Sequence, residues 1–179
     1  IAQLLALDRP GVDAMVLLAS TAFDAWPTAV TREIQDTPPE QEVEELIWTL
    51  WTSHEDREAE EIMAEAIEGM EVGALDAARI LLDDLTDRFP DWAEAWNRRA
   101  TLCFIEKRDA DCLADIERTL ALEPRHFGAL AGLGMIMQEI GDEKRALDAF
   151  RKALAVNPHL EKVPELVKTL TDKVEGRDI

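Results

Sequence analysis

Few side chains in this 179-residue sequence have the types and spacing that chemistry requires. Its three histidines, His54, His126 and His159, fall at expected turns and lack the short spacing of metal ligands. Asp109 and Asp111 faintly suggest a calcium loop, but the glycine of such a loop is missing, and acids also favour the first turn of a helix. No phosphate-binding loop and no nucleophile–base motif is present. The sequence therefore predicts no metal, no cofactor and no enzymatic activity.

Cys103 and Cys112 are the two cysteines of the chain. They could form a disulfide if the protein is exported. The expected helices place them about one turn out of step, and a free cysteine packs as a small hydrophobe. Two buried thiols are the favoured interpretation.

The chain is strongly acidic, with 38 acidic and 19 basic residues and a net charge of −19. Such a chain repels phosphate backbones and anionic headgroups, which argues against nucleic acid or a membrane surface as partner. The longest uncharged run near the start, residues 14–23, is shorter than the roughly 18 residues of a membrane span. Residues 1–92 hold 22 acidic and 5 basic side chains, against 16 and 14 in residues 93–179. The acidic half is either a solvated face or a surface that steers a basic partner.

A period of 34 residues runs through residues 59–160. Prolines recur at this spacing where second helices would end, and Gly73 and Gly141 recur where first helices would stop. Four further columns share the period, two small and two large: Ala66, Ala100 and Gly134; Ala78, Cys112 and Ala146; Ile62, Trp96 and Leu130; Leu82, Ile116 and Phe150. Antiparallel helices approach closely only where small residues meet. We therefore expect each small residue of the first column to face the one twelve positions later, as Gly134 would face Ala146.

These columns resemble the tetratricopeptide repeat (TPR) family. The unit 127–160 carries a nearly full signature, whereas the units 93–126 and 59–92 are more degenerate, and the signature residues of the last unit are Leu133, Gly134, Ala146, Phe150, Ala153 and Pro158. The resemblance implies an all-α fold, a right-handed α-solenoid of antiparallel helix pairs. The whole layout is similar to that of bacterial, proteobacterial TPR proteins of unassigned partner.

The segments outside the repeats have distinct patterns. Residues 37–58 predict an N-terminal packing helix over about 38–53, opened by a threonine N-cap and two prolines. Residues 161–179 predict a capping helix over 163–175 and a tail, because an apolar stripe there can cover the last repeat. Residues 1–36 are poorly patterned, and are read either as a short buried helix or as the remnant of an export signal. The resemblance to exported proteins favours the periplasm over the cytoplasm.

Family geometry places the first helices of successive units on the concave side of the solenoid. The resemblance therefore implies a partner-binding groove on that side, with the residues Met63, Ile67, Met70, Asn97, Arg98, Thr101, Phe104, Met135 and Gln138. Arg98 could hold a carboxylate of the partner. The competing interpretation pairs Arg98 with Glu94, four residues earlier on the same helix, and the methionines have core packing as their alternative. Ala64 and Ala131 occupy groove positions, so the clamp by which related TPR proteins bind acidic chaperone tails is absent.

The favoured function is a non-enzymatic scaffold that binds a peptide or helix of a protein partner in the concave groove. The alternative is a structural or assembly subunit that uses its acidic N-terminal face or self-association. The sequence does not set the oligomeric state.

Overall fold

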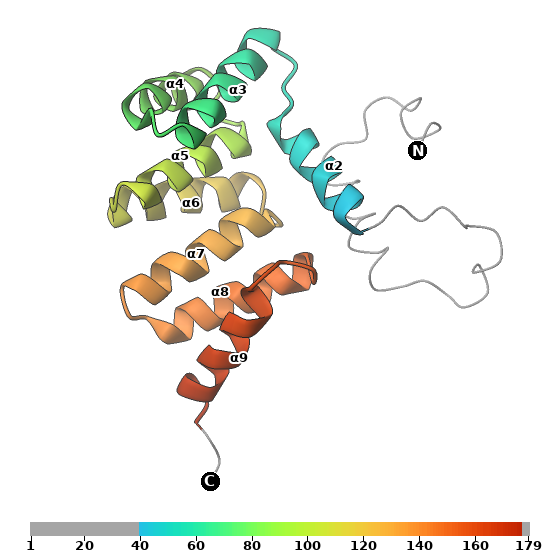
Figure 1. Ribbon diagram of the computed structural model, residues 1–179, viewed down its shortest axis with the longest axis vertical. Helices are drawn as coiled ribbons and strands as arrows, with labels where there is room; N and C mark the ends of the chain where they lie inside the picture. Colours follow the sequence, from blue (N-terminus) through green and yellow to red (C-terminus); the bar gives the residue numbers. More distant parts are fainter. Residues whose placement is uncertain (1–39, 177–179) are drawn as a thin grey trace, which may run out of the picture. The chain divides into compact units, whose positions relative to one another are not determined.

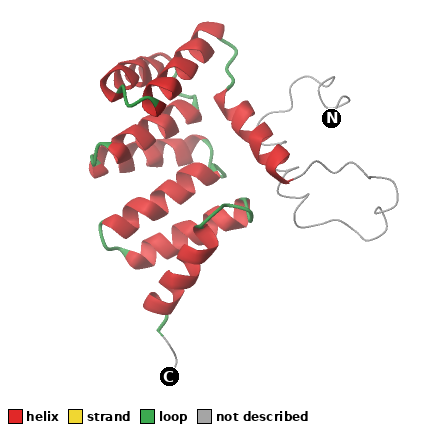
Figure 2. Cartoon of the chain, viewed as in Figure 1, coloured by secondary structure: helices red, strands yellow, loops and turns green. Residues whose placement is uncertain are grey.

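The computed structural model describes residues 40–176, and the side chains from residue 44 onward (Figure 1). The expectations for residues 1–36, including the export-signal remnant, and for the N-cap threonine of the first predicted helix lie outside this range. Every regular element of the described residues is an α-helix, and none is a strand (Figure 2). The predicted all-α fold is confirmed. The described residues divide into two units, one up to Ser53 and one from His54 onward.

The first unit contains α2, Glu40–Thr52, where the sequence predicts a helix over 38–53. Trp48 and Trp51 lie one turn apart in α2, and their rings meet edge to face with centroids 5.3 Å apart. The hydroxyl of Thr52 donates to the carbonyl of Trp48 at 2.9 Å, so this hydroxyl is hydrogen-bonded within the last turn of its own helix.

The second unit is built from three helix pairs and one terminal helix, as Figure 1 shows. The second and third pairs lie within the units 93–126 and 127–160, and the first pair begins two residues before the unit 59–92. The elements are α3 (Arg57–Glu71), α4 (Leu75–Arg88), α5 (Ala93–Ile105), α6 (Asp109–Leu122), α7 (Phe127–Glu139), α8 (Glu143–Val156) and α9 (Val163–Val174). Contacts join α3 to α5 and α5 to α7, so the first helices of the pairs form one continuous surface, here called the first-helix face.

Small residues lie where the helices of the first two pairs approach each other, and the middle pair brings Ala100 next to Cys112, as the column pattern predicts. The thiol of Cys112 donates to the carbonyl of Ala100 at 3.1 Å, which joins α5 to α6. Between α3 and α4, a methyl group added at Gly69 would lie 3.4 Å from the methyl of Ala78.

The third pair corrects one expectation. The atoms nearest an added Cβ at Gly134 belong to the ring of Phe150, the closest at 2.5 Å, and not to Ala146. The reason is the size of the residue in the adjacent large column. Where the first two units have Leu82 and Ile116, the third has a phenylalanine, whose ring occupies the space that an alanine side chain would need.

The turns inside the three pairs share one hydrogen-bond pattern. Gly73 and Gly141 adopt φ of 79° and 83°, the left-handed conformation that ends many helices. In the middle pair the same position is Lys107, with φ of 59°. The next N–H in each turn reaches back to a carbonyl five residues earlier, for example from Arg108 to Cys103 at 2.9 Å. The turn geometry is therefore kept even where the glycine is lost.

The last hairpin is covered by α9. Val163 and Leu170 are buried in one cluster with Leu147 and Phe150 of α8. Pro164 stands in the first turn of α9, where its missing N–H costs no helical hydrogen bond. The apolar stripe of α9 thereby shields the end of the helix stack from water.

Candidate functional site

A hollow of about 180 Å³ opens on the first-helix face between α5 and α7. No residue that lines it carries a formal charge. Its wall on α7 is low because Gly128, Ala131 and Gly132 have small or no side chains there. Its remaining lining residues come from α5, α6 and α7: Asn97, Ala100, Thr101, Phe104, Cys112, Ile116, Ala129, Met135 and Ile136.

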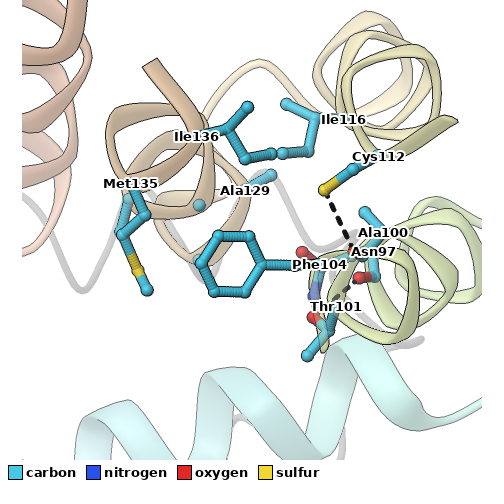
Figure 3. Close-up of a pocket in the computed structure, with 12 residues that line it drawn as sticks. Asn97, Ala100, Thr101, Phe104, Cys112, Ile116, Ala129, Met135 and Ile136 are labelled. Atoms are coloured by element: carbon cyan, nitrogen blue, oxygen red, sulfur yellow. Dashed lines mark hydrogen bonds between the residues drawn. The ribbon is translucent and has the colours of Figure 1, made fainter. Parts of the chain in front are cut away.

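Phe104 and Met135 supply the largest apolar groups at the mouth of the hollow. Figure 3 shows the Phe104 ring reaching from α5 toward α7, while Ile116 and Ile136 lie next to each other. Phe104 is half-buried and Met135 is 42% exposed. Because water wets these apolar surfaces in the free protein, covering them with another apolar group is favourable.

A buried carboxylate organises the α5 side of the hollow. Glu94 is 1% exposed, and its carboxylate accepts hydrogen bonds from the Asn97 amide at 3.0 Å and from Arg98. Its third partner is His126, whose Nε2 lies 2.8 Å from Glu94 Oε2. These donors offset the free energy that burying a carboxylate costs.

His126 joins this carboxylate to the start of α7. Its Nδ1 accepts the backbone N–H of Ala129 at 3.1 Å, which caps the helix. A neutral imidazole that accepts at Nδ1 carries its proton on Nε2, so Nε2 donates to Glu94. The helices on both sides of the hollow, α5 and α7, are therefore held together by one buried side chain.

This buried pair was not predicted from the sequence. The signal lay in the repeat column of Trp92, His126 and Leu160, which is otherwise apolar. A histidine in a packed column needs buried hydrogen-bond partners. Glu94 lies 32 residues earlier, within the same repeat unit.

Arg99 makes a second network that was not predicted from the sequence. Its guanidinium donates to both carboxylate oxygens of Asp115 on α6, at 2.9 and 2.7 Å, and to Asp83 and Thr86 on α4. The neighbouring anions raise the pKa of Arg99. Arg99 thereby joins the first two repeat pairs and is not among the residues that line the hollow.

The nine residues predicted to bind a partner fall into three groups. Four line the hollow: Asn97, Thr101, Phe104 and Met135. Ile67 and Met70 are half-buried against the core of the first pair, and Gln138 is exposed in the last turn of α7.

Met63 and Arg98 need correction as open contact residues. Met63 is 1% exposed and belongs to the core formed with Ala66 and Leu82, because its unbranched side chain fills the interior of the first pair. Arg98 is paired with Glu94, as its competing interpretation held. The Nε–H that a bidentate grip on a partner's carboxylate could use is therefore already engaged with Glu94.

Both cysteines are free and buried. Burial raises the pKa of the Cys103 thiol and raises that of Cys112 to about 12. Both are therefore protonated at neutral pH, when a thiol is a poor nucleophile and metal ligand. Within residues 40–176, no group of three or more His, Cys, Asp or Glu side chains is arranged to hold a metal ion. No helix of that part is long and apolar enough to cross a bilayer.

Comparisons with known proteins show what the repeat is similar to. A TPR repeat-containing protein of Rhizobium etli is 40% identical over 100 residues, which are 56% of this chain and 49% of that relative. Solved TPR structures share the fold. The first TPR domain of Spaghetti (RPAP3), bound to an HSP90 peptide, has a TM-score of 0.62 at 16% identity, over 66% of this chain and 94% of its own.

The three helix pairs have the fold of tetratricopeptide repeat domains. The TPR domain of Arabidopsis OM64 matches with a TM-score of 0.62 at 16% identity, over 65% of this chain and 96% of that domain. MamA matches with the same TM-score at 18% identity, over 67% of this chain and 70% of MamA. No family model matches the sequence. The match spans about half the length of the Rhizobium etli TPR protein.

Proposed function

We propose that the first-helix face binds a peptide or helix of a partner protein, with one of its side chains in the hollow between α5 and α7. TPR proteins generally serve as non-enzymatic interaction scaffolds. The observation that carries the proposal is the uncharged hollow itself, which is open to solvent on one side and floored by apolar groups. An engineered cavity of about 150 Å³ is large enough for benzene, so a hollow of about 180 Å³ suits one large apolar side chain.

Asn97 supplies the polar contact that such a site needs. Its amide nitrogen donates to Glu94, which leaves the carbonyl oxygen of the side chain available to accept. Asn97 is 7% exposed and lines the hollow. An extended partner can therefore donate a backbone N–H to Asn97 while its side chain enters the hollow. The buried Glu94 acts as a positioning residue for this amide.

The proposed role is binding and not catalysis. The buried thiols have raised pKa values. Glu94 and His126, the buried acid and imidazole nearest the hollow, are engaged with each other and with the cap of α7. The thiols, Glu94 and His126 therefore have structural roles in this proposal, and the hollow binds its ligand by fitting the shape of an apolar side chain.

Filling the hollow tests the proposal. Peptides are selected on the full chain from a random display library, and their affinities are then measured by fluorescence anisotropy. Ala131→Phe places a ring in the hollow and should abolish binding. Ala155→Phe makes the same change at an exposed position of α8 and should leave the affinity within about twofold, since surface changes are usually small. Equal affinity for both variants would rule the hollow out as the binding site.

A further inference from the structure

The exposed apolar side chains of the second unit are concentrated on one part of its surface. Among the described residues of this unit, five large hydrophobic side chains are exposed. Four of them belong to the first helices or the residues that end those helices: Val72, Ile105, Met135 and Ile140. Single exposed hydrophobics are ordinary, but Val72 and Ile140 occupy the same repeat position in the first and third units, and exposed apolar groups gathered on one face are typical of an interaction surface.

Three of these residues mark the ends of α3, α5 and α7. Val72 and Ile140 are the C-caps of α3 and α7, and Ile105 is the last residue of α5. Because the three first helices run side by side with equal spacing in sequence, their C-terminal ends lie along one edge of the first-helix face. We call this edge the C-terminal edge. The hollow opens on the same face, with Phe104 in the last turn of α5 on its wall.

The last helical turns along this edge carry acidic side chains and no basic ones. Glu68 and Glu71 are exposed in the last turn of α3, and Glu139 ends α7. The last turns of α3, α5 and α7 contain no basic residue. A helix C-terminus already carries a partial negative charge, so an acid there is unfavourable for the fold and a cation is favourable.

At the α3 end of the edge, the negative charge of the glutamates is not balanced by basic side chains in the described part of the chain. Glu139 receives Lys107 at 2.7 Å, which lies beyond the end of α5. No basic side chain within the described residues pairs with Glu68 or Glu71. The α3 end therefore combines an exposed valine, two carboxylates and a helix C-terminus, all of which would gain from a basic and apolar neighbour.

We infer that the partner segment is basic and amphipathic, with a large apolar anchor in the hollow and lysine or arginine side chains against the C-terminal end of α3. This inference rests on the proposed function and specifies the chemistry of its ligand. The occupant is a segment of another protein. A second copy of this chain carries a net charge of −19 and repels the edge, and an anionic membrane repels it for the same reason.

The test uses the full chain and a fluorescein-labelled peptide of about 12 residues with a central phenylalanine flanked by lysines. Matched peptides replace the lysines with glutamates, or the phenylalanine with alanine. The lysine peptide should bind at least about tenfold more tightly than either, and its affinity should fall with salt because the contacts lie at the surface.

Charge reversal locates the contact. Glu68→Lys with Glu71→Lys should weaken binding of the lysine peptide roughly tenfold, since two attractive contacts become repulsive. The matched control, Asp87→Lys with Glu117→Lys, changes the net charge equally at exposed positions of α4 and α6 and should change the affinity less than about twofold. Circular dichroism checks that both pairs remain folded.

The failures of the two proposals are distinguishable. If the glutamate peptide binds as well as the lysine peptide, or if the reversal at α3 has no effect while Ala131→Phe still blocks binding, the basic partner is excluded and the groove remains. If Ala131→Phe also has no effect, the proposed function fails too. A mass that rises with concentration in light scattering, together with no peptide binding, would assign the surface to a second copy and overturn the inference.

Discussion

Gly134 is the position where the packing of the third repeat can be tested most sharply. A Cβ built there would lie 2.5, 2.5 and 2.8 Å from three ring atoms of Phe150. The ring is fully buried, so it has no free end that can move aside. Gly134→Ala must therefore displace either the ring or α7.

The expected magnitude is a balance of two terms. Overpacking a filled core costs about 1–3 kcal/mol, and replacing glycine by alanine inside a helix gains about 1 kcal/mol. Contacts with three ring atoms place the cost near the upper end, so Gly134→Ala should lower the free energy of unfolding by about 1–2 kcal/mol. Gly132→Ala is the matched control on the same helix. Its Cβ would meet only Ile116, at an ordinary 3.5 Å, and the protein should gain about 0.5–1 kcal/mol from helix propensity.

Phe150→Ile supplies the second arm of a double-mutant cycle. The middle repeat already combines alanine with isoleucine at these two columns, as Ala100 and Ile116. The isoleucine should make room for the new methyl group, so the double variant should be more stable than the sum of the single changes by at least about 1 kcal/mol. Urea unfolding followed by circular dichroism at 222 nm measures all four proteins. A Gly134→Ala variant as stable as Gly132→Ala, or effects that simply add, would refute the packing argument.

Three further predictions follow from single side chains. Lys107→Gly should raise the unfolding free energy by about 0.5–1 kcal/mol in urea titrations, because glycine adopts the positive φ of that turn without strain; a loss of stability would contradict this reasoning. Arg99→Met should lower the unfolding free energy by about 2 kcal/mol, mostly because the buried Asp115 loses its partner. Asp115→Asn in the same background should recover part of this loss. An unchanged melting temperature for Arg99→Met would contradict a stabilising role for this network. The raised pKa of Cys112 means that the folded state holds this thiol proton more tightly than the unfolded chain, so stability should fall as pH rises from about 9 to about 12. Cys112→Ala should reduce this dependence of the melting temperature on pH. The same pH dependence in both proteins would argue against burial of the thiol as its cause.

The repeat period predicted most of the fold, because close helix packing needs small residues at fixed positions. The columns of Ala66 and Ala78 recur every 34 residues, and a recurring pattern can be seen without knowing what each residue touches. The turn glycines Gly73 and Gly141 follow the same logic, since their φ values demand glycine. The turn at Lys107 has the same geometry without a glycine, so the sequence did not predict it.

The candidate site was only half predictable, because its polar contacts are departures from the repeat. Family geometry placed Phe104 and Met135 on the first-helix face, and both line the hollow. Glu94 and His126 are polar residues in two different repeat columns. Each provides the hydrogen-bond partner that the other needs when buried, and the two meet only in the folded protein. Met63 shows the opposite error, since a methionine at helical spacing fits a core or a groove equally well in sequence.

Methyl NMR of the full chain with a selected peptide tests directly whether the hollow is the binding site. Intermolecular contacts should run from the apolar anchor of the peptide to the methyl groups of Met135, Ile116 and Ile136. Ile80 is exposed on α4, outside the hollow, and should show no contact. Contacts at Ile80 without any at Met135 would contradict the proposed binding site.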